Sequence, residues 1–265
     1  MTASMNRSFL VLNLDDTLTW QPALLAAPHE WIDLRHLPGK NACATPEALA
    51  AIAAALAPHQ EVPLCFWGAG EYHYVTLLRL QALRRPVTLV LFDHHHDAAP
   101  LQGDLVTCGN WVRHALNLPW VRRAVWVGGR HPEMQLYLPH PRLLRAAEPT
   151  PPEPFAEWAL QAIPTADVYI SIDKDVLTGD DSATTWGAGD LALAELMDWL
   201  KALARHRRIV GADVCGEWSL SPAQVFPGPQ DRRAIARNQR ANLAIRDLLA
   251  PALVPGAPAA PSRTG

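Results

Sequence analysis

The chain has 265 residues, a formal net charge of −3 and a hydrophobic content of 49%. This length suits a single α/β domain, and the apolar fraction is sufficient for a sizeable core. The small net charge gives no reason to expect nucleic acid or an anionic membrane as a partner. No apolar run reaches the roughly 18 residues of a membrane-spanning helix, so we expect no membrane partner.

The N-terminal segment and the cysteines bear on the cellular compartment of the protein. The segment MTASMNRSFLVLNL lacks the long apolar region and small-residue cleavage site of a signal peptide, so it is interpreted as leading into a first strand. The four cysteines show no CxxC spacing; they are Cys43, Cys65, Cys108 and Cys215. Scattered cysteines are typical of reduced thiols, so we expect a cytoplasmic protein.

Apolar, β-branched runs alternate with helical patterns along the chain. Strands are predicted over Phe9–Leu14, Val62–Trp67, Val87–Phe92, Ala124–Val127, Val168–Ile172 and Arg208–Ala212. Helices are predicted from Pro46 onward, after a capping Thr45, and over Val75–Leu83, Trp111–Leu116, Phe155–Ala162, Leu191–Arg205 and Asp231–Leu249. Most strand candidates are continuous apolar runs, which indicates burial on both faces. The alternation predicts a parallel sheet with helices on both sides.

The chain shows no internal repeat, and residues 1–250 are predicted to form one domain. The Pro-rich stretch Glu148–Pro154 is interpreted as a loop, because the polar residues discussed next lie on both sides of it. Residues 251–265 are rich in Pro and Ala and are predicted to be a disordered tail.

Acids and histidines follow four of the predicted strands. The sequences after them are Asp93-His94-His95-His96-Asp97, Asp173-Lys174-Asp175, Asp213 with Glu217, and a Gly-rich segment ending at His73. In open parallel sheets, ligands bind beyond the carboxyl ends of the strands, so these side chains should converge there. Several converging carboxylates repel one another without a counter-charge, and divalent metal ions supply one.

The spacing of these residues sharpens the metal hypothesis. In an extended segment alternate side chains share a face, so Asp93, His95 and Asp97 should point the same way. By the same argument Asp173 and Asp175 share a face and leave Lys174 on the other side. Carboxylate and imidazole ligands suit Mn²⁺, and a shared carboxylate can hold two ions roughly 3.5–4 Å apart with a hydroxide between them.

The segments GAGEYHYVT, FDHHHDAAP, SIDKDVL and GADVCGEWS resemble, in order, the motifs of the arginase/agmatinase (ureohydrolase) superfamily. The resemblance implies a three-layer α/β/α fold around a central, mostly parallel eight-stranded sheet. It also implies a binuclear metal centre with two Mn²⁺. One ion would be held by His73, Asp93, Asp97 and Asp173, and the other by Asp93, His95, Asp173 and Asp175.

The sequence departs from the pattern of true arginases at several places. One extra residue precedes His73, and Glu217 falls four residues after Asp213, where arginases have three. The segment TCGNWVRH resembles the arginase Ser-Gly-Asn-x-His. Val112 occupies the position of the histidine, and the nearest histidine is His114. Ala99 stands where arginases hold the amino-acid end of arginine with an Asn. The chain therefore resembles a different branch, related to arginases and histone-deacetylase-like hydrolases.

The resemblance implies hydrolysis of a C–N bond other than a peptide bond, through a metal-bridging hydroxide. The substrate would be a small or peptide-borne guanidino or amidino compound (a linear amidine), and a homo-oligomer is possible within this family. The hydroxide would attack the planar carbon, and an amine would leave after protonation. Asp97, Asp175 and His114 are candidates for moving the proton, and Glu217 for pairing with a cationic substrate.

Three alternatives stay open on the sequence. The first is a single-zinc (Zn²⁺) deacetylase-like amide hydrolase with the same fold, and the second is a non-catalytic, metal-stabilised binding protein. The third comes from LVLNLDDTLT, which resembles the signature of haloacid-dehalogenase phosphatases. That chemistry needs an Asp nucleophile where this chain has Asn13, and an amide is a poor nucleophile.

Overall fold

All eight strands of the central sheet run parallel, in the spatial order β2-β1-β4-β10-β9-β5-β7-β8. Their bounds are β1 Phe9–Asn13, β2 His29–Asp33, β4 Leu64–Trp67, β5 Val87–Phe92, β7 Val121–Val127, β8 Leu143–Ala146, β9 Asp167–Asp173 and β10 Arg208–Cys215. Two further strands, β3 (Cys43–Ala44) and β6 (Val106–Thr107), form a small antiparallel pair. The computed structural model describes residues 9–129, 140–146 and 155–253.

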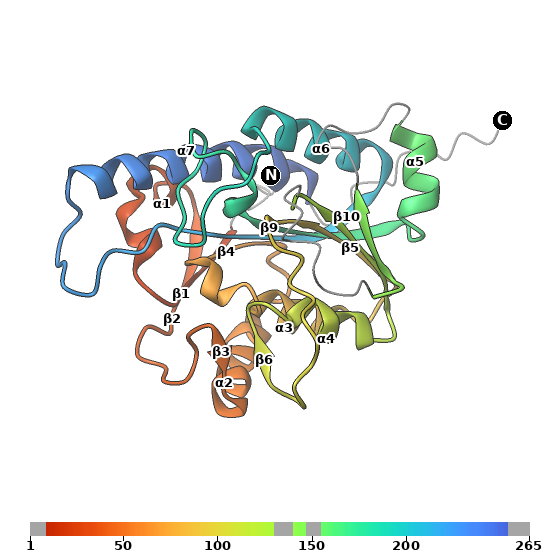
Figure 1. Cartoon of the computed structure of the whole chain (residues 1–265), viewed down its shortest axis with the longest axis horizontal. Coiled ribbons are helices and arrows are strands. Elements are labelled where there is room, and N and C mark those ends of the chain that lie inside the picture. The colour runs from red at the N-terminus through yellow and green to blue at the C-terminus, as the bar shows by residue number, and fades with distance from the viewer. Residues whose placement is uncertain (1–8, 130–139, 147–154, 254–265) are drawn as a thin grey trace, which may run out of the picture.

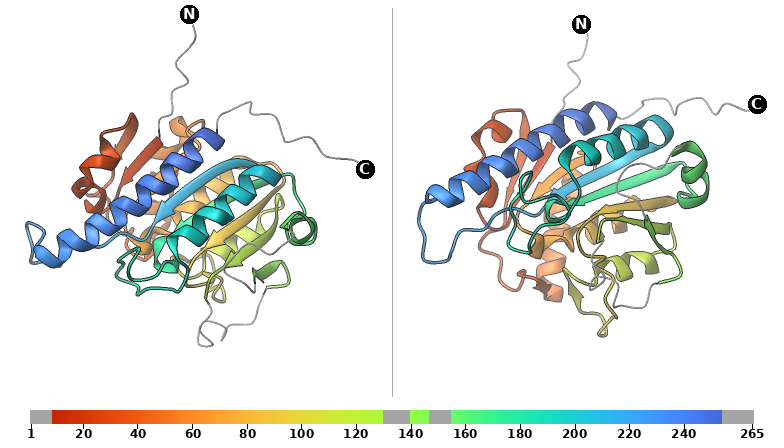
Figure 2. Two further views of the ribbon diagram at one scale, coloured as in Figure 1. Left: turned by 90° about the horizontal axis from the view of Figure 1, so that it is seen from above. Right: turned by 45° about the horizontal axis from the view of Figure 1, so that its top comes forward.

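The helices lie in two layers, one on each side of the sheet (Figures 1 and 2). Their bounds are α1 Pro22–Leu25, α2 Pro46–Leu56, α3 Val75–Leu83, α4 Trp111–Asn117, α5 Phe155–Ala162, α6 Leu193–His206 and α7 Pro229–Ala252. Helices α6 and α7 lie side by side over one face, and α2, α3 and α4 cover the other. The predicted three-layer α/β/α fold is therefore confirmed.

Strand β1 shows why both faces are covered. Phe9 and Val11 belong to the apolar core under α6 and α7, whereas Leu10 and Leu12 belong to the core under α2 and α3. Since side chains alternate along a strand, a strand apolar at every position needs a helix layer on each side. The same continuous burial holds through β4, β5 and β9.

Most predicted elements are found, and the differences lie at the sheet edges and the C-terminus. The edge strands β2 and β8 were not predicted, because both are only partly buried and lack a continuous apolar run. Thr45 caps α2 as expected, its side chain accepting from the Ala48 N–H. Helix α7 continues through Pro251 to Ala252, so the tail cannot begin at residue 251 as predicted. Residues 254–265 and the predicted loop Glu148–Pro154 lie outside the described residues.

No helix in the described part of the chain is both long and apolar enough to span a membrane. The parallel arrangement brings the carboxyl ends of β4, β5, β9 and β10 together at one edge of the sheet. These four strands are neighbours or near-neighbours in the sheet, and they are the strands that the polar motifs follow.

Candidate metal centre

The first ligand group joins the ends of β4 and β5. Nδ1 of His73 lies 3.1 Å from Oδ2 of Asp93 and 3.1 Å from Oδ2 of Asp97. All three residues are buried, with exposed fractions of 1%, 1% and 8%. One atom from each could ligate the same metal ion.

The second group joins the ends of β5 and β9. Nδ1 of His95 lies 2.8 Å from Oδ2 of Asp175 and 3.6 Å from Oδ1 of Asp93. These three residues could also hold one ion. Asp93 belongs to both groups, so these are two adjacent candidate sites that share a carboxylate.

Asp173 lies against the first group, and Cys215 lies beside it. Oδ2 of Asp173 is 3.8 Å from Nδ1 of His73 and 3.4 Å from Sγ of Cys215. His73, Asp173 and Cys215 form a third set of atoms close enough to share an ion. The structure thus brings together all six predicted ligand positions, and it adds Cys215, which sequence reasoning assigned no role at the site.

The local backbone differs from the extended geometry expected for both motifs. After β5 ends at Phe92 the chain bends, and Asp97 has a left-handed backbone with φ of +47°. Asp175 lies in a single turn of 3-10 helix, Lys174–Val176, whose N–H at Asp175 binds the Asp173 side chain. The ligands therefore converge through tight turns, and the prediction of strand-like alternation was wrong in its geometry. A left-handed backbone is uncommon for a residue other than glycine, and strained residues of this kind cluster at functional sites.

Two buried atoms at the centre of the first group have no hydrogen-bond partner. These are Nδ1 of His73 and Oδ2 of Asp93, which approach each other without hydrogen-bond geometry. Buried polar atoms are nearly always paired, because an unpaired one loses its hydration without compensation. Both atoms have lone pairs that can bind a metal ion, so these residues fit the metal centre that the sequence motifs imply.

The electrostatics of the ion-free cluster point the same way. Burial, followed by the charge of Asp93, raises the pKa of Asp97 to about 7. Burial, followed by the charges of Asp173 and Asp93, raises the pKa of Asp175 well above its ordinary value. Burial disfavours charged His95, but its contacts with Asp175 and Asp93 outweigh this and raise its pKa to about 11. Without a cation the cluster must hold protons that a metal ion would displace.

A hydrogen-bond chain behind His73 fixes its orientation. Ser171 donates to Oδ1 of Asp213 at 2.7 Å, and its oxygen lies 2.8 Å from Nε2 of His73. Since the Ser171 proton goes to Asp213, Ser171 accepts from Nε2–H, which leaves Nδ1 with its lone pair directed at Asp93 and Asp97. Asp213, an acid at a predicted strand end, therefore supports a ligand and belongs to none of the ligand groups in the described residues.

We expect Ser171→Ala to weaken metal binding about 10- to 100-fold while the protein still folds, because loss of such a supporting hydrogen bond has this effect in metal sites. Isothermal titration with Mn²⁺ measures the change. Thr88→Val is a matched control, since Thr88 is equally buried but pairs its hydroxyl with that of Thr165 at the opposite edge of the sheet. Equal affinities for wild type and Ser171→Ala would contradict the assigned role.

Trp111 supports a second ligand from the opposite side. Its indole Nε1–H donates to Oδ2 of Asp97 at 2.7 Å, and its ring centroid lies 4.8 Å from that of His73. Trp111 is the first residue of α4 and is completely buried. The only sequence signal for it was its place within the segment TCGNWVRH.

The family assignment follows from comparison with known proteins. A model of the arginase family matches residues 15–224, most of the chain. The chain belongs to the arginase family. An uncharacterised protein of Thermotoga maritima is 30% identical to this arginase-family chain over 226 residues, which are 85% of this chain and 83% of the relative.

Solved structures confirm the fold. Formimidoylglutamase from Bacillus subtilis superposes with a TM-score of 0.68 at 16% identity, covering 94% of this chain and 88% of that one. Proclavaminate amidino hydrolase from Streptomyces clavuligerus superposes with a TM-score of 0.60 at 16% identity, covering 92% of each chain.

The segment that resembles the haloacid-dehalogenase signature overlaps the arginase-family match from Asp15 onward. Asp15 accepts hydrogen bonds there from Thr17 and from the backbone N–H of Ala69.

Glu217 lies in a buried polar network of this arginase-family fold. Lys174 donates to its Oε1 at 2.6 Å, and Asn242 donates to the same oxygen at 2.7 Å. Gln21 donates to Oε2 at 2.7 Å. Lys174 and Glu217 are 0% and 2% exposed. Both oxygens of Glu217 accept hydrogen bonds from protein donors. The carboxylate is therefore poorly placed for the predicted role of binding a cationic substrate.

His114 lies on α4, where its Nε2 approaches the carbonyl of Leu105 at 3.0 Å. It belongs to none of the metal-capable groups in the described residues. Asn110 of the same segment binds the backbone of Thr107 and Leu105 and so shapes the loop before α4. The proton-relay role of His114 stays a prediction.

Trp186 covers one side of the cluster. Its ring lies 6.1 Å from that of His95, edge to face, and it is 44% exposed. A Cβ at Gly70 would come within 2.7 Å of Oδ2 of Asp173 and 2.9 Å of Cδ1 of Trp186, so glycine is needed for this approach. Trp218 donates its indole N–H to Oδ1 of Asp231 at 2.9 Å.

Proposed function

We propose that this arginase-family protein is a binuclear-metal hydrolase that cleaves a C–N bond in an amidino or guanidino compound. The observation that carries the proposal is the sharing of Asp93 between two adjacent ligand groups, one with His73 and Asp97 and one with His95 and Asp175. The names of the structural relatives, an amidino hydrolase and a formimidoylglutamase, support the substrate class.

The side chains that would hold two Mn²⁺ are His73, Asp93, His95, Asp97, Asp173 and Asp175. When bound, such ions generate a nucleophile from solvent at neutral pH and polarise the substrate. Asp97 is our candidate for moving the proton to the leaving amine. Its Oδ2 is held by Trp111, while its Oδ1 accepts no hydrogen bond from the described residues. Trp186, edge-on to His95, would exclude water from that side.

We assign the remainder of the substrate to a cavity of about 620 Å³. Glu71 and Tyr72, which line it, directly precede His73, and Thr185 on its wall precedes Trp186. Oε2 of Glu71 is buried and has no hydrogen-bond partner. An unpaired carboxylate oxygen beside aromatic rings suits a cationic or hydrogen-bond-donating substrate.

The proposal is tested by measuring urea, amine and ammonia release from a panel of compounds by the Mn²⁺-loaded protein. The panel includes formimidoyl-glutamate, agmatine, free arginine and arginine within a peptide, each with a chelator-treated sample as control. We expect metal-dependent release from at least one amidino or guanidino compound. Release from an acetyl-lysine peptide alone would favour the deacetylase-like alternative, and no release from any compound would favour a binding protein.

The metal content separates the same alternatives without an activity assay. Elemental analysis of protein dialysed against Mn²⁺ should give two ions per chain, because the two ligand groups are distinct apart from Asp93. One zinc per chain after purification in mixed metals, with no second ion taken up, would contradict the binuclear proposal.

Metal removal should destabilise the protein more at pH 8 than at pH 6. The ion-free fold holds extra protons on Asp97, with a pKa of about 7, and on His95, with a pKa of about 11. Both values lie above those of the unfolded chain, so the stability that these protons contribute is lost as the pH rises through the folded-state values. The affinity for metal ions increases as the pH rises, because bound ions require deprotonated ligands. Melting temperatures with Mn²⁺ and with chelator should therefore diverge with rising pH; a constant difference would contradict this.

A further inference from the structure

Three pairs of consecutive arginines stand at the starts of three strands, and the proposed function uses none of them. They are Arg84-Arg85 before β5, Arg122-Arg123 in β7 and Arg207-Arg208 at β10. Because all strands of the sheet are parallel, these pairs meet at the amino edge, opposite the metal-ligand cluster. They concentrate positive charge at one edge of a chain whose net charge is −3.

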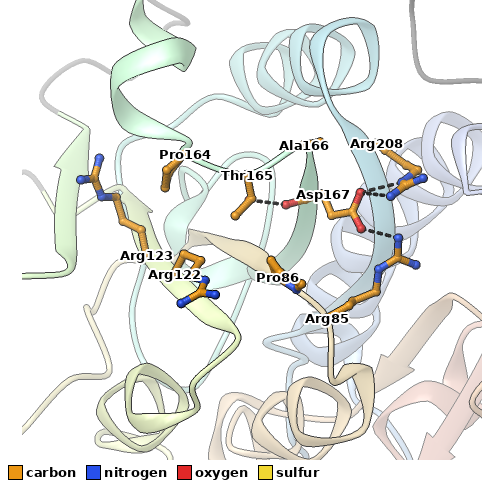
Figure 3. Close-up of a pocket in the computed structure, with 9 residues that line it drawn as sticks. All are labelled: Arg85, Pro86, Arg122, Arg123, Pro164, Thr165, Ala166, Asp167 and Arg208. Carbon is orange, nitrogen blue, oxygen red and sulfur yellow. Dashed lines mark hydrogen bonds and ion pairs between the residues drawn. The ribbon is translucent and has the colours of Figure 1, made fainter.

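Four of these arginines line a pocket of about 840 Å³ at this edge (Figure 3). The only acid in its lining is Asp167, the first residue of β9. The lining therefore carries an excess of three positive charges. Like charges gathered in this way repel one another, and a bound anion relieves the repulsion.

Two arginines hold Asp167 and still have donors left. Nη2 of Arg85 lies 2.5 Å from Oδ2 of Asp167, and Nη2 of Arg208 lies 2.5 Å from Oδ1 (Figure 3). Both arginines are nearly half exposed, at 45% and 48% of the side chain, whereas Asp167 is buried. A guanidinium has five N–H donors, so this pairing fixes both groups in place without exhausting them.

Arg122 and Arg123 differ in the hydrogen bonds that their side chains make. Arg123 donates to the carbonyls of Gln161 and Ala162 at the end of α5 and so has a structural role. Arg122 is exposed and makes no hydrogen bond or ion pair with the described residues. It is therefore the arginine of this pocket with its whole guanidinium available to a ligand.

The chemistry of the lining narrows the class of ligand. Guanidinium groups bind phosphate oxygens in pairs with charge-assisted hydrogen bonds, and three excess charges suit a ligand with at least two negative charges. The remaining lining consists of Pro86, Pro164, Thr165 and Ala166. It offers no aromatic ring on which a nucleobase could stack, which favours a phosphate group without a base.

We propose that this pocket is a binding site for a multivalent phosphate anion, with pyrophosphate as the simplest member of the class, at the edge of the sheet opposite the metal centre. Arg122 provides donors at one end of the pocket, and Arg85 and Arg208, both positioned by Asp167, provide them at the other end (Figure 3). The ligand in the cell is either a free polyphosphate or a phosphorylated metabolite, which share this chemistry. The site does not depend on the proposed hydrolase activity.

The test is isothermal titration of the full-length, metal-loaded protein with pyrophosphate at about 100 mM chloride, repeated after chelation. Since the pocket lies opposite the metal cluster, both samples should bind one pyrophosphate with a Kd below about 1 mM. Binding that disappears on chelation would place the anion at the metal centre and overturn the proposal. No binding in either sample would also overturn it.

Variants locate the bound anion. Arg122→Gln should weaken binding about tenfold and Arg122→Glu should abolish it, because a charge-assisted donor is lost and then replaced by repulsion. Arg233→Gln and Arg233→Glu, at an exposed arginine on α7, are matched controls and should bind as wild type. Unchanged affinity in Arg122→Glu would overturn the proposal.

Titrations with further ligands distinguish a free polyphosphate from a phosphorylated metabolite as the bound anion. A hexose bisphosphate that binds more tightly than pyrophosphate would indicate a phosphorylated metabolite, and the reverse order would indicate a free polyphosphate. ATP should bind no more tightly than tripolyphosphate, because the lining has no stacking surface for adenine. A clear preference for ATP would overturn the assignment to phosphate alone.

Discussion

Replacing Asp93 with Asn should lower the rate of hydrolysis by at least about a thousandfold, since the charge stabilisation at risk in such a centre is several kcal/mol. Asp93 is the residue common to both ligand groups. Its Oδ2 faces His73, and its Oδ1 accepts from the backbone N–H of His95. An amide keeps one neutral oxygen but cannot place a negative charge between two cations. We therefore expect the bound Mn²⁺ to fall below two per chain in the same variant.

Asp104→Asn is the matched control, because Asp104 is exposed and carries the same change of charge. Its activity and metal content should equal those of wild type. Far-ultraviolet circular dichroism of both variants in chelator checks that the fold is retained. An Asp93→Asn protein that binds two Mn²⁺ and turns over at the wild-type rate would remove the basis of the binuclear proposal.

The fold was predictable from sequence, and so was the meeting of the candidate ligands at one edge of the sheet, because both depend on short-range patterns. A strand buried on both faces has a continuous apolar run, as in Val87–Phe92, and a ligand at its carboxyl end follows within a few residues, as Asp93 does. The parallel topology then requires the separate motifs to meet at one edge. The edge strand β2 lacks this signal, since three of its five residues are half-buried and the other two exposed.

The contacts behind the ligands were not predictable, because they join residues far apart in the chain. Gln21 meets Glu217, and Thr76 meets Asp213, through hydrogen bonds that no local pattern encodes. The course of the chain after β5 was also missed, since the left-handed backbone of Asp97 depends on how the loop packs. The strand pattern thus placed the candidate ligands at one edge of the sheet but gave neither their supports nor their exact backbone geometry.

Lys174→Met should destabilise the protein by about 3–5 kcal/mol, the usual cost of leaving one member of a buried ion pair uncompensated. Lys174 lies between Asp173 and Asp175, donates to the Cys215 carbonyl at 2.8 Å and is completely buried against Glu217. At roughly 2–4 °C per kcal/mol, the melting temperature should fall by about 10 °C. Lys201→Met breaks the exposed pair with Asp198 and should cost at most about 0.5 kcal/mol, which makes it a control for charge and volume.

Glu217→Gln decides between the two roles considered for this acid. If Glu217 positions the turn that carries Asp173 and Asp175, Glu217→Gln should lower the melting temperature as Lys174→Met does, and the double variant should lose less than the sum of the two. The affinity for Mn²⁺ should fall in both single variants, because the turn loses its support. If Glu217 instead binds a cationic substrate, Glu217→Gln should raise KM while stability and metal affinity stay unchanged. Since Lys174, Gln21 and Asn242 already occupy both oxygens, we expect the first result.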